Sequence, residues 1–449
     1  MIKKIKFLQN IDETSLKLFK HIGFSSIYKA GSILIGLVLV PLSITYLGSG
    51  QYGLWLTIFS FLGWFNIVDF GIGNGLRNKL TQAFASDHME LAKSYISTAY
   101  FSIAFISIVS FLFFIIIFPM VAWNVVFNYD ANDKSVHQLI FIAFMMFAVN
   151  LTLKNINVVF YADQRSSLPE QFSFIGQLLT LISVYLAMTV TKNSLLLYGV
   201  IILGSQMVIL FSISLITFLG KYKHIGPNIN YFNLSYVKDI LSIGGKFFII
   251  QISAALLYTT DNFIINYVLG SSQVTIYNIS YKYFMLVITI MTIIATPYWS
   301  AFTNAYTQNN DIWIEKSMKM LFKISIVVSV ITIIMIVFAQ KIYLLWIGDL
   351  VNIPFLLTLI MGLNTIMRVF MYPMVMFLNG IGKVQIELYL GFILAIINIP
   401  LSIFLAKNME LGVSGVILAT LIVGLVEFIV FSTQVRKILN KSARGIWNA

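Results

Sequence analysis

The chain has 449 residues, of which 59% are hydrophobic and only 10% are charged, and its mean hydropathy is +0.89. Soluble domains have about 45–50% apolar and about 25% charged residues, so a soluble fold is excluded and an integral membrane protein is predicted. Cysteine is absent, which excludes disulfides, thiol catalysis and Cys-ligated metals. The 4 histidines are scattered without metal-ligand spacing, and no cofactor is expected.

Long apolar stretches follow one another along the whole chain. A helix needs about 20 apolar residues to cross the hydrocarbon core. On this scale we predict an all-α polytopic membrane protein with about 12 transmembrane helices. The predicted spans are residues 23–47, 52–75, 95–122, 138–161, 169–190, 195–219, 240–269, 275–305, 318–340, 353–379, 384–406 and 411–434.

The distribution of Lys and Arg predicts the orientation of these spans. The basic N-terminal residues 3–20 lead into an apolar segment that is too long for a cleavable signal peptide. With the N-terminus inside the cell, the outer connections carry only Lys134, Lys192, Lys341 and Lys407. Most of the other basic residues lie in the inner connections, which predicts that both termini are cytoplasmic. This asymmetry also explains the net charge of +12 without a nucleic-acid partner.

A short motif occurs twice. Residues 47–51 read LGSGQ, and residues 269–273 read LGSSQ. Each copy closes the first span of one half of the chain. Two halves with six spans each have the same orientation, so they would form a parallel repeat about an axis normal to the membrane. We therefore predict two six-helix bundles, formed by residues 1–230 and 231–449.

Several charged residues interrupt otherwise apolar spans. A charge at membrane depth costs about 2.5–3.5 kcal/mol even on the lenient insertion scale, and such residues normally face a cavity on a substrate or ion path. The cations outnumber the anions, which predicts a transporter for a negatively charged, amphiphilic substrate. The cations are Lys29, Lys154, Lys246, Lys282 and Arg368, and the anions are Asp69, Asp261 and Glu427.

The depths of the five cations differ. Arg368 lies near the middle of its predicted span, too deep to reach the interface easily, and is our first choice for an anion-binding residue. Lys29, Lys154 and Lys246 lie about two turns from the cytoplasmic end, where a lysine can also extend its ammonium group to the interface. With Lys282 in the outer half, the five residues would form a ladder of cations across the membrane.

The acidic residues have two interpretations, both open at this stage. Asp69 matches Lys29 in depth, and Asp261 matches Lys282, so each pair could be a neutralising ion pair. Alternatively, a desolvated carboxylate could take up a proton or Na⁺ and couple transport to an ion gradient. Glu427 has no obvious partner in the sequence and is a further candidate for coupling.

The most informative motif is residues 52–80, YGLWLTIFSFLGWFNIVDFGIGNGLRNKL, which follow YLGSGQ. This stretch resembles the polysaccharide flippases, the Wzx-type O-antigen and capsule transporters of the multidrug/oligosaccharidyl-lipid/polysaccharide exporter superfamily. Weaker similarities are YADQRSSLPE at 161–170, FLNGIGKVQ at 377–385 and LGVSGVILAT at 411–420. With the layout of the spans, the resemblance covers nearly the whole chain.

The resemblance implies a flippase in a bacterial inner membrane. Its substrate would be an undecaprenyl-pyrophosphate-linked oligosaccharide, the repeat unit of O-antigen (lipopolysaccharide) or capsule. It further implies two bundles around a cationic cavity, alternating access and coupling to H⁺ or Na⁺. Besides membrane lipid, its implied partners are a polysaccharide polymerase and a chain-length regulator. Related members flip the peptidoglycan precursor lipid or export drugs, and both activities remain alternatives.

The glycine-rich residues 71–75 superficially resemble a nucleotide-binding loop, but they follow a membrane helix instead of a β-strand. We interpret them as glycine turns that end the second span. Arg77 and Lys79 would then lie at the cytoplasmic surface, where Arg77 could meet a lipid pyrophosphate. The sequence has no Walker A motif, so the chain cannot hydrolyse ATP by itself.

Two rival functions are weaker. A membrane polysaccharide polymerase generally needs a large outer loop, and the longest one here, residues 123–137, is too small. An antiporter for cationic drugs is disfavoured because like charges in the cavity would repel such drugs. We therefore expect a secondary transporter and no enzyme activity.

We predict that Ala85 and Gly445 both lie in the cytoplasm, because the inner connections hold most of the basic residues. Reporter fusions at these two positions measure their side of the membrane. A periplasmic signal at either position would contradict the arrangement of two bundles with six spans each.

Overall fold

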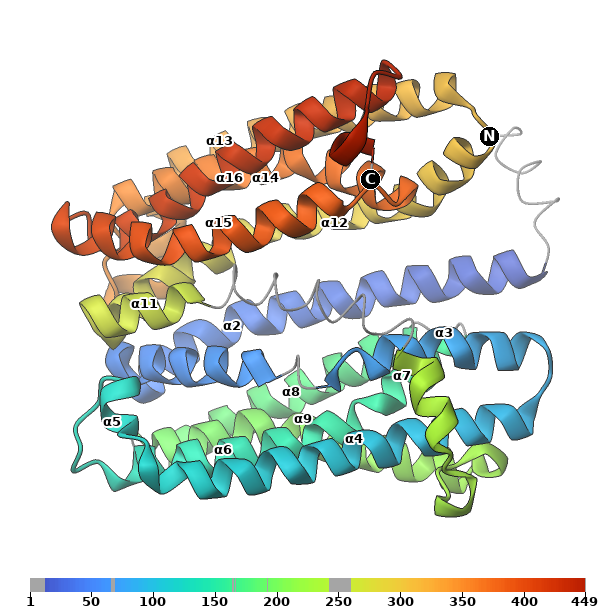
Figure 1. The fold of residues 1–449 in the computed structure, drawn as a ribbon. Helices are drawn as coiled ribbons and strands as arrows, with labels where there is room; N and C mark the ends of the chain where they lie inside the picture. Colours follow the sequence, from blue (N-terminus) through green and yellow to red (C-terminus); the bar gives the residue numbers. More distant parts are fainter. Residues whose placement is uncertain are drawn as a thin grey trace, which may run out of the picture. The chain divides into compact units, whose positions relative to one another are not determined.

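The computed structural model describes residues 13–65, 69–163, 165, 167–191, 193–241 and 260–448. Every regular element in these ranges is helical (Figure 1). In the described ranges, 10 helices are long and apolar enough to cross a membrane. The prediction of an all-α polytopic membrane protein is confirmed. The predicted span 240–269, with Lys246, lies largely outside the described residues, which begin again at Thr260.

The contacts divide the chain into two compact units. Unit 1 consists of Met1–Gly48 and Leu62–Gln251, and unit 2 consists of Ser49–Phe61 and Ile252–Ala449. Residues 49–61 therefore pack with the C-terminal part of the chain, although their neighbours on both sides belong to unit 1. The bundles predicted at 1–230 and 231–449 stay a prediction.

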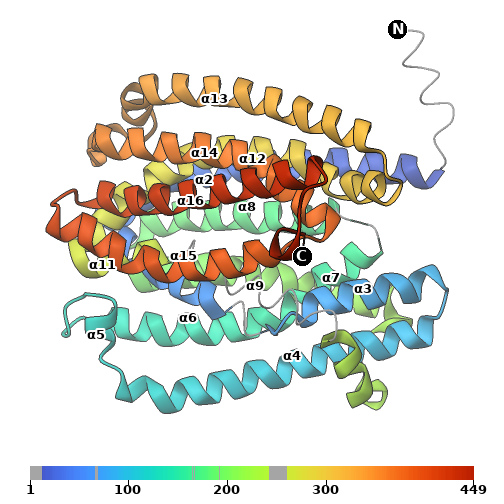
Figure 2. The same ribbon diagram turned by 45° about the horizontal axis from the view of Figure 1, so that its top comes forward.

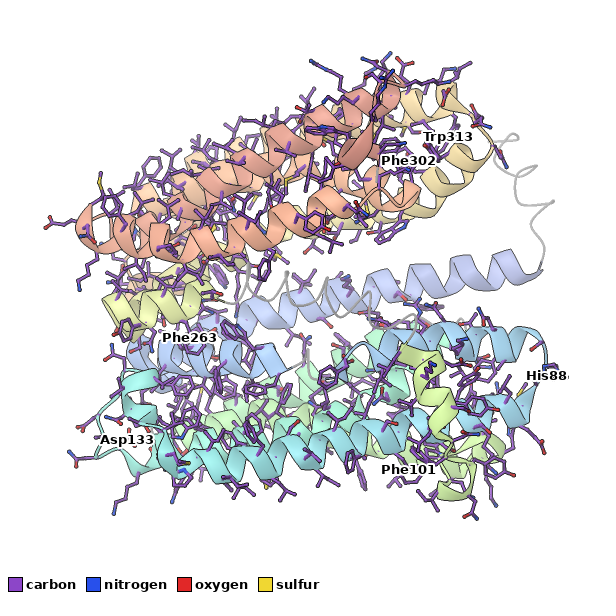
Figure 3. The ribbon with its side chains drawn as sticks, viewed as in Figure 1. His88, Phe101, Asp133, Phe263, Phe302 and Trp313 are labelled. Atoms are coloured by element: carbon purple, nitrogen blue, oxygen red, sulfur yellow. The ribbon has the colours of Figure 1, made fainter. Side chains whose placement is uncertain are left out.

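Unit 1 is a bundle in which α4 and α9 both pack against α6, and α3 packs against α4 and α7. Asp133 accepts hydrogen bonds from the backbone N–H groups of Ser135 and Val136 and so caps α6. Figure 3 shows Asp133 at the opposite end of unit 1 from His88, which precedes α4. The elements are α2 (Glu13–Trp64, up to Gly48), α3 (Ile72–Ala85), α4 (Met89–Ile117), η2 (Phe118–Met120), α5 (Trp123–Val126), α6 (Lys134–Leu153), α7 (Asn155–Ala162), α8 (Ser167–Val190), α9 (Leu195–Leu219), η3 (Lys223–Ile225) and η4 (Ile229–Tyr231).

Unit 2 is built around α14, which packs against α12, α13 and α16 (Figure 2). At one end of the unit, Phe302 packs edge-on against Trp313 and Phe377, with ring centroids 5.9 and 5.3 Å apart (Figure 3). The elements are α11 (Thr260–Leu269), α12 (Ser271–Thr307), α13 (Asp311–Ile347), η5 (Gly348–Leu350), α14 (Phe355–Ile381), α15 (Gln385–Ile403), η6 (Phe404–Asn408), α16 (Val413–Leu439) and η7 (Gly445–Asn448), together with residues 49–61 of α2.

The repeated LGS motif has the same backbone geometry in both copies. Gly48 has φ 77° and interrupts α2, and Gly270 has φ 94° and separates α11 from α12. Only glycine adopts such angles without steric cost, so each motif ends one helix and starts another. Gly48 therefore divides α2 between the first two predicted spans, 23–47 and 52–75.

The second predicted span is wrong in its C-terminal part. The helix ends at Trp64, and a new helix, α3, begins at Ile72. Phe70 and Gly71 both have positive φ, and the Asp69 carboxylate accepts the backbone N–H of Gly71 at 2.9 Å. This carboxylate satisfies a donor that an uninterrupted helix would have paired with a carbonyl, so the helix breaks here. The glycine run thus starts a helix instead of ending one.

The two LGS turns touch each other inside unit 2. The Thr275 hydroxyl donates to the Ser49 carbonyl oxygen at 2.6 Å. A Cβ atom on Gly53 would lie 1.7 Å from the carbonyl oxygen of Ser271. Backbone can move little at such a contact, so this junction requires glycine at position 53.

We predict that Gly53→Ala destabilises the protein by about 1–3 kcal/mol, because the added methyl group overpacks a backbone contact. Gly391→Ala is the matched control, because no atom lies within 4 Å of its added Cβ and alanine favours a helix interior. Thermal unfolding in detergent measures both variants. Equal melting temperatures for the two variants would contradict the close approach of the turns.

Candidate functional site

Unit 2 contains a cavity of about 220 Å³. Its wall combines one carboxylate, one guanidinium group, two phenols and several amides with apolar side chains. The lining residues are Ser60, Asp261, Asn262, Tyr277, Asn278, Tyr281, Phe284, Met285, Ile288, Met361, Asn364, Thr365, Arg368 and Ile417.

Helical periodicity places these side chains together. On α12, Tyr277, Tyr281 and Ile288 follow one another at intervals of four and seven residues and share one face of the helix. On α14, Asn364 and Arg368 are four residues apart and also share a face. Because α12 and α14 pack against each other, the two polar faces meet at the cavity.

Asp261 is the acidic group of this cavity and is only 6% exposed. The Tyr277 hydroxyl donates to its Oδ2 atom at 2.5 Å. The described residues offer its Oδ1 atom no hydrogen-bond partner. A buried carboxylate oxygen without a donor is costly, so Asp261 has an acceptor available for a ligand, a proton or a cation.

A chain of amides forms a second polar wall. The Asn278 side-chain amide donates to Asn262 Oδ1 at 2.7 Å, and the Asn262 amide donates to Ser60 Oγ at 2.7 Å. These bonds hold the amide groups in fixed orientations along one side of the cavity. Asn364 adds a buried side-chain oxygen for which the described residues provide no donor.

Arg368 lies at the midpoint of α14 and contributes the guanidinium group. It interacts electrostatically with the carboxylates of Asp261 and Glu427. Asp261 lines the cavity described above, whereas Glu427 lines a separate small cavity that Arg368 also borders. Arg368, the first choice from the sequence for an anion-binding residue, borders the larger cavity together with Asp261.

The neighbour of Lys282 is a tyrosine, whereas the sequence suggested Asp261. Its ammonium group donates to the Tyr52 hydroxyl at 3.1 Å and lies 5.9 Å from the centre of the Tyr52 ring. Tyr52 belongs to residues 49–61, which pack in unit 2. The sequence suggested an ion pair between Lys282 and Asp261. In the structure, Lys282 contacts Tyr52 and Asp261 contacts Tyr277.

In unit 1, Asp69 pairs with Lys154, their charged atoms being 3.9 Å apart. The suggested partner, Lys29, is instead exposed on α2. Lys154 lies at the break between α6 and α7, and its ammonium group pairs with Asp69 from there. The depth of a residue in a span does not show in which direction its side chain points around the helix axis. For this reason, the sequence suggested Lys29 instead of Lys154 as the partner of Asp69.

Arg77 lies exposed on α3, and its guanidinium carbon is 5.0 Å from the centre of the Tyr161 ring. Tyr161 opens the YADQR motif, in which Arg165 pairs with Asp163 at 2.8 Å. Lys246 is outside the described residues. Among the candidate residues of unit 1 that the structure describes, Asp69 and Lys154 form an ion pair.

The cavity of unit 2 can bind an ionic group. Arg368 offers paired N–H donors in a plane, which suits the oxygens of a phosphate or carboxylate. The amides and phenols can hydrogen-bond to hydroxyl groups, and the apolar wall can contact a hydrocarbon chain. Within the described residues, no group of three or more His, Cys, Asp or Glu side chains could hold a metal ion.

Sequence reasoning missed the neutral polar residues of this site. Tyr277, Asn262, Asn278 and Asn364 all lie in apolar segments, and each pays a desolvation penalty when it is buried without a partner. Asparagine within a predicted span was the signal that could have identified them.

Two family models match the chain. The model described as polysaccharide biosynthesis protein matches residues 18–303, and the model described as MatE matches residues 247–404. The second range includes all of α11, α12 and α14, the helices that line most of the cavity. No curated protein matches the chain at a significant level.

Solved structures of transporters share this fold. The inward-facing conformation of a multidrug resistance MATE family transporter of the MOP superfamily has a TM-score of 0.75 and 15% identity, covering 94% of this chain and 96% of that chain. The outward-facing conformation of such a transporter has a TM-score of 0.63 and 16% identity, with the same coverage. A MOP superfamily transporter from Pyrococcus furiosus, described as having a binding pocket of reverse polarity, has a TM-score of 0.66 and 16% identity, covering 95% and 97%.

We predict that Lys154→Met destabilises unit 1, because it leaves the buried Asp69 carboxylate without its cation. The expected loss is about 1–3 kcal/mol, less than for a fully buried pair because the Lys154 side chain is 32% exposed. The double variant Asp69→Asn, Lys154→Met should regain at least half of this loss. Thermal unfolding of the wild type, the single variants Lys154→Met and Asp69→Asn, and the double variant gives the coupling energy. Strictly additive effects would show that the pair does not interact.

Proposed function

The chain belongs to the polysaccharide biosynthesis protein family and has the fold of the MOP superfamily of transporters, and on this premise we propose that it is a flippase for a lipid-linked oligosaccharide. The substrate in this proposal is an undecaprenyl-pyrophosphate-linked repeat unit of O-antigen or capsule. The protein moves it from the inner to the outer leaflet of a bacterial inner membrane by alternating access.

The observation that carries the proposal is the position of Arg368. Its guanidinium group lies at the midpoint of a membrane helix and borders a cavity. A charge at this depth is expensive, and a pyrophosphate head group must cross the same depth. An arginine that faces a cavity lowers this barrier by providing charge-assisted, bidentate hydrogen bonds to phosphate oxygens.

The other walls of the cavity fit the remaining parts of such a substrate. The amides of Asn262, Asn278 and Asn364 can hydrogen-bond to sugar hydroxyl groups. Tyr277 and Tyr281 stack at 6.4 Å with an angle of 11° between their rings, and such a pair of rings can pack against a sugar. The apolar residues Phe284, Met285 and Ile288 suit the first isoprene units of the lipid.

The remaining sequence candidates keep their roles as part of the proposal. In unit 2, Lys282 adds a second cation near the cavity-lining face of α12. In unit 1, Arg77 and Lys154 supply cations, and Lys29 and Lys246 complete the set. Asp69, Asp261 and Glu427 are the candidate sites for coupling to H⁺ or Na⁺, the first being engaged by Lys154.

The cellular setting belongs to the same proposal. Both termini lie in the cytoplasm, as the distribution of basic residues predicts. A polysaccharide polymerase and a chain-length regulator would use the flipped units on the outer side. A flippase for the peptidoglycan precursor lipid would need the same anion-binding group, so the glycan that is carried must be identified by transport assays.

Export of cationic drugs is a second candidate function. It is favoured by the MatE match over residues 247–404 and by the buried carboxylate of Asp261. Arg368 in the same cavity opposes it, because a cation would meet a like charge in a low-dielectric site. Efflux of ethidium from cells that express the protein distinguishes this function from glycan export.

We predict that Arg368→Ala abolishes export of the lipid-linked glycan while the protein is still made at a normal level. Arg368→Lys should restore part of the export, because the charge is kept while the planar, bidentate geometry is lost. The assay measures surface glycan and protein level together in a strain that lacks its own flippase. Normal surface glycan with Arg368→Ala would refute the proposed role of the cavity.

Arg444→Ala is the matched control, because Arg444 is exposed in the C-terminal segment beyond α16. Loss of one positive charge there should leave export unchanged. Lys282→Ala should give an intermediate loss, because Lys282 contributes charge without being the central cation. A loss with Arg444→Ala equal to that with Arg368→Ala would point to net charge instead of the cavity.

A further inference from the structure

A second, smaller cavity in unit 2 is also bordered by Arg368. Its volume is about 20 Å³, and a cavity needs about 10–15 Å³ to hold one water molecule. It joins three helices, α14, α15 and α16. The lining residues are Met367, Arg368, Met371, Asn398, Thr420, Val423, Gly424 and Glu427.

Arg368 borders both cavities and interacts electrostatically with a carboxylate from each of them. Asp261, in the larger cavity, also receives a hydrogen bond from Tyr277. Glu427, in the smaller cavity, lies near a second carboxylate, Glu387 of α15, which repels it. Arg368 therefore supplies the opposite charge that favours the ionised form of Glu427.

Asn398 provides an independent indication of a proton at this place. Its side chain is 2% exposed and lines the smaller cavity, and the described residues give its Oδ1 atom no donor. A carbonyl oxygen in a buried site needs a donor. A protonated carboxyl group has an O–H donor, whereas an ionised one only accepts. Asn398 is therefore suited to the neutral form of Glu427, through a direct hydrogen bond or through one water molecule.

We propose that Glu427 takes up a proton when an anionic head group binds to Arg368 in the larger cavity. This inference rests on the proposed function only for the identity of the anion. The bound anion attracts the guanidinium group, and Glu427 loses part of the attraction that keeps it ionised. A proton from water then adds to a carboxylate oxygen, and the O–H group donates toward Asn398 Oδ1.

The coupling works in both directions. Because binding free energies are reciprocal, protonation of Glu427 must strengthen the binding of the anion by the same factor. When no anion is present, Glu427 again serves as a counter-ion for Arg368 and the proton leaves. The proton and the anion are therefore bound together. The proton on Glu427 balances one negative charge of the head group while the head group lies in the cavity.

The charged groups around Glu427 are consistent with this exchange. From α14 it faces Arg368, and from α15 it faces Glu387. The helices α11 and α12, which also contact α16, bring Asp261 and Tyr277 to the other side of Arg368. In η6, the basic residue is Lys407, but η6 packs against Gly415, about 18 Å along α16 from Glu427 at 1.5 Å per residue.

The test is a count of protons taken up on binding. Farnesyl pyrophosphate is the probe, and it is titrated into the full-length protein in detergent by calorimetry. Two buffers with different ionisation enthalpies at the same pH give the number of protons exchanged per bound probe. Protonation of the probe itself contributes equally to all variants, so the difference between variants reports on the protein.

We expect the wild type to take up more protons per bound probe than Glu427→Gln, by up to one proton. Glu427→Gln should still bind the probe, because the neutral amide mimics the protonated acid. Asn398→Ala should lower the uptake and weaken binding several-fold, because the neutral acid loses its acceptor. Glu315→Gln, on the exposed surface of α13, should match the wild type.

Equal proton uptake by the wild type, Glu427→Gln and Asn398→Ala would overturn the inference, as would binding without Arg368. If Glu427→Gln does not fold, the uptake by Asn398→Ala decides alone. If the protein exports glycan but its proton uptake does not depend on Glu427, the proposed function stands and this inference is refuted. If proton uptake depends on Glu427 but no glycan is exported, this inference stands and the proposed function is refuted.

Discussion

An unpaired charge cannot remain ionised at low cost in the middle of a membrane protein, and unit 2 is organised around this constraint. Arg368 is the charge in question, and Asp261 and Glu427 lie on its two sides. In water, such interactions are weak, but they strengthen several-fold in a medium of low dielectric constant. Polar residues of α11, α12 and α16 are therefore needed around Arg368, where they line the two cavities.

The same constraint acts on a smaller scale in unit 1. Asp69 sits at a break in the second span, where a backbone N–H is available. The carboxylate needs that donor, and the broken helix needs an acceptor. Lys154 lies at a corresponding break between α6 and α7 and supplies the cation. At the first break the Asp69 carboxylate accepts a backbone N–H, and at the second the Asn155 side-chain amide donates to the backbone carbonyl oxygens of Leu151 and Thr152.

The sequence allowed some of this to be predicted. Apolar length predicted the fold class, and a charged residue in an apolar run identified Arg368 and Asp261 as cavity residues. It did not identify their partners, because spans that are apolar on all sides have no preferred face from which a direction could be inferred. The suggested pair of Asp69 with Lys29 therefore rested on depth alone. In the structure, Asp69 pairs with Lys154.

The break after the second span was missed for a local reason. A run of glycines after an apolar helix is typical of a helix C-terminus, and nothing in the sequence distinguished this from a start. The deciding features are the positive φ of Phe70, a residue that rarely adopts it, and the hydrogen bond from Gly71 to Asp69. Both depend on tertiary packing, which periodicity alone does not reveal.

The assignment of residues 49–61 to unit 2 has a consequence for how such a protein can be divided. Tyr52 and Ser60 contact Lys282 and Asn262, so a wall of the larger cavity comes from the N-terminal part of the gene. A fragment that starts at residue 231 would lack this wall even if all its own helices formed. The chain therefore cannot be divided at this boundary without opening the larger cavity, because one of its walls would stay with the N-terminal fragment.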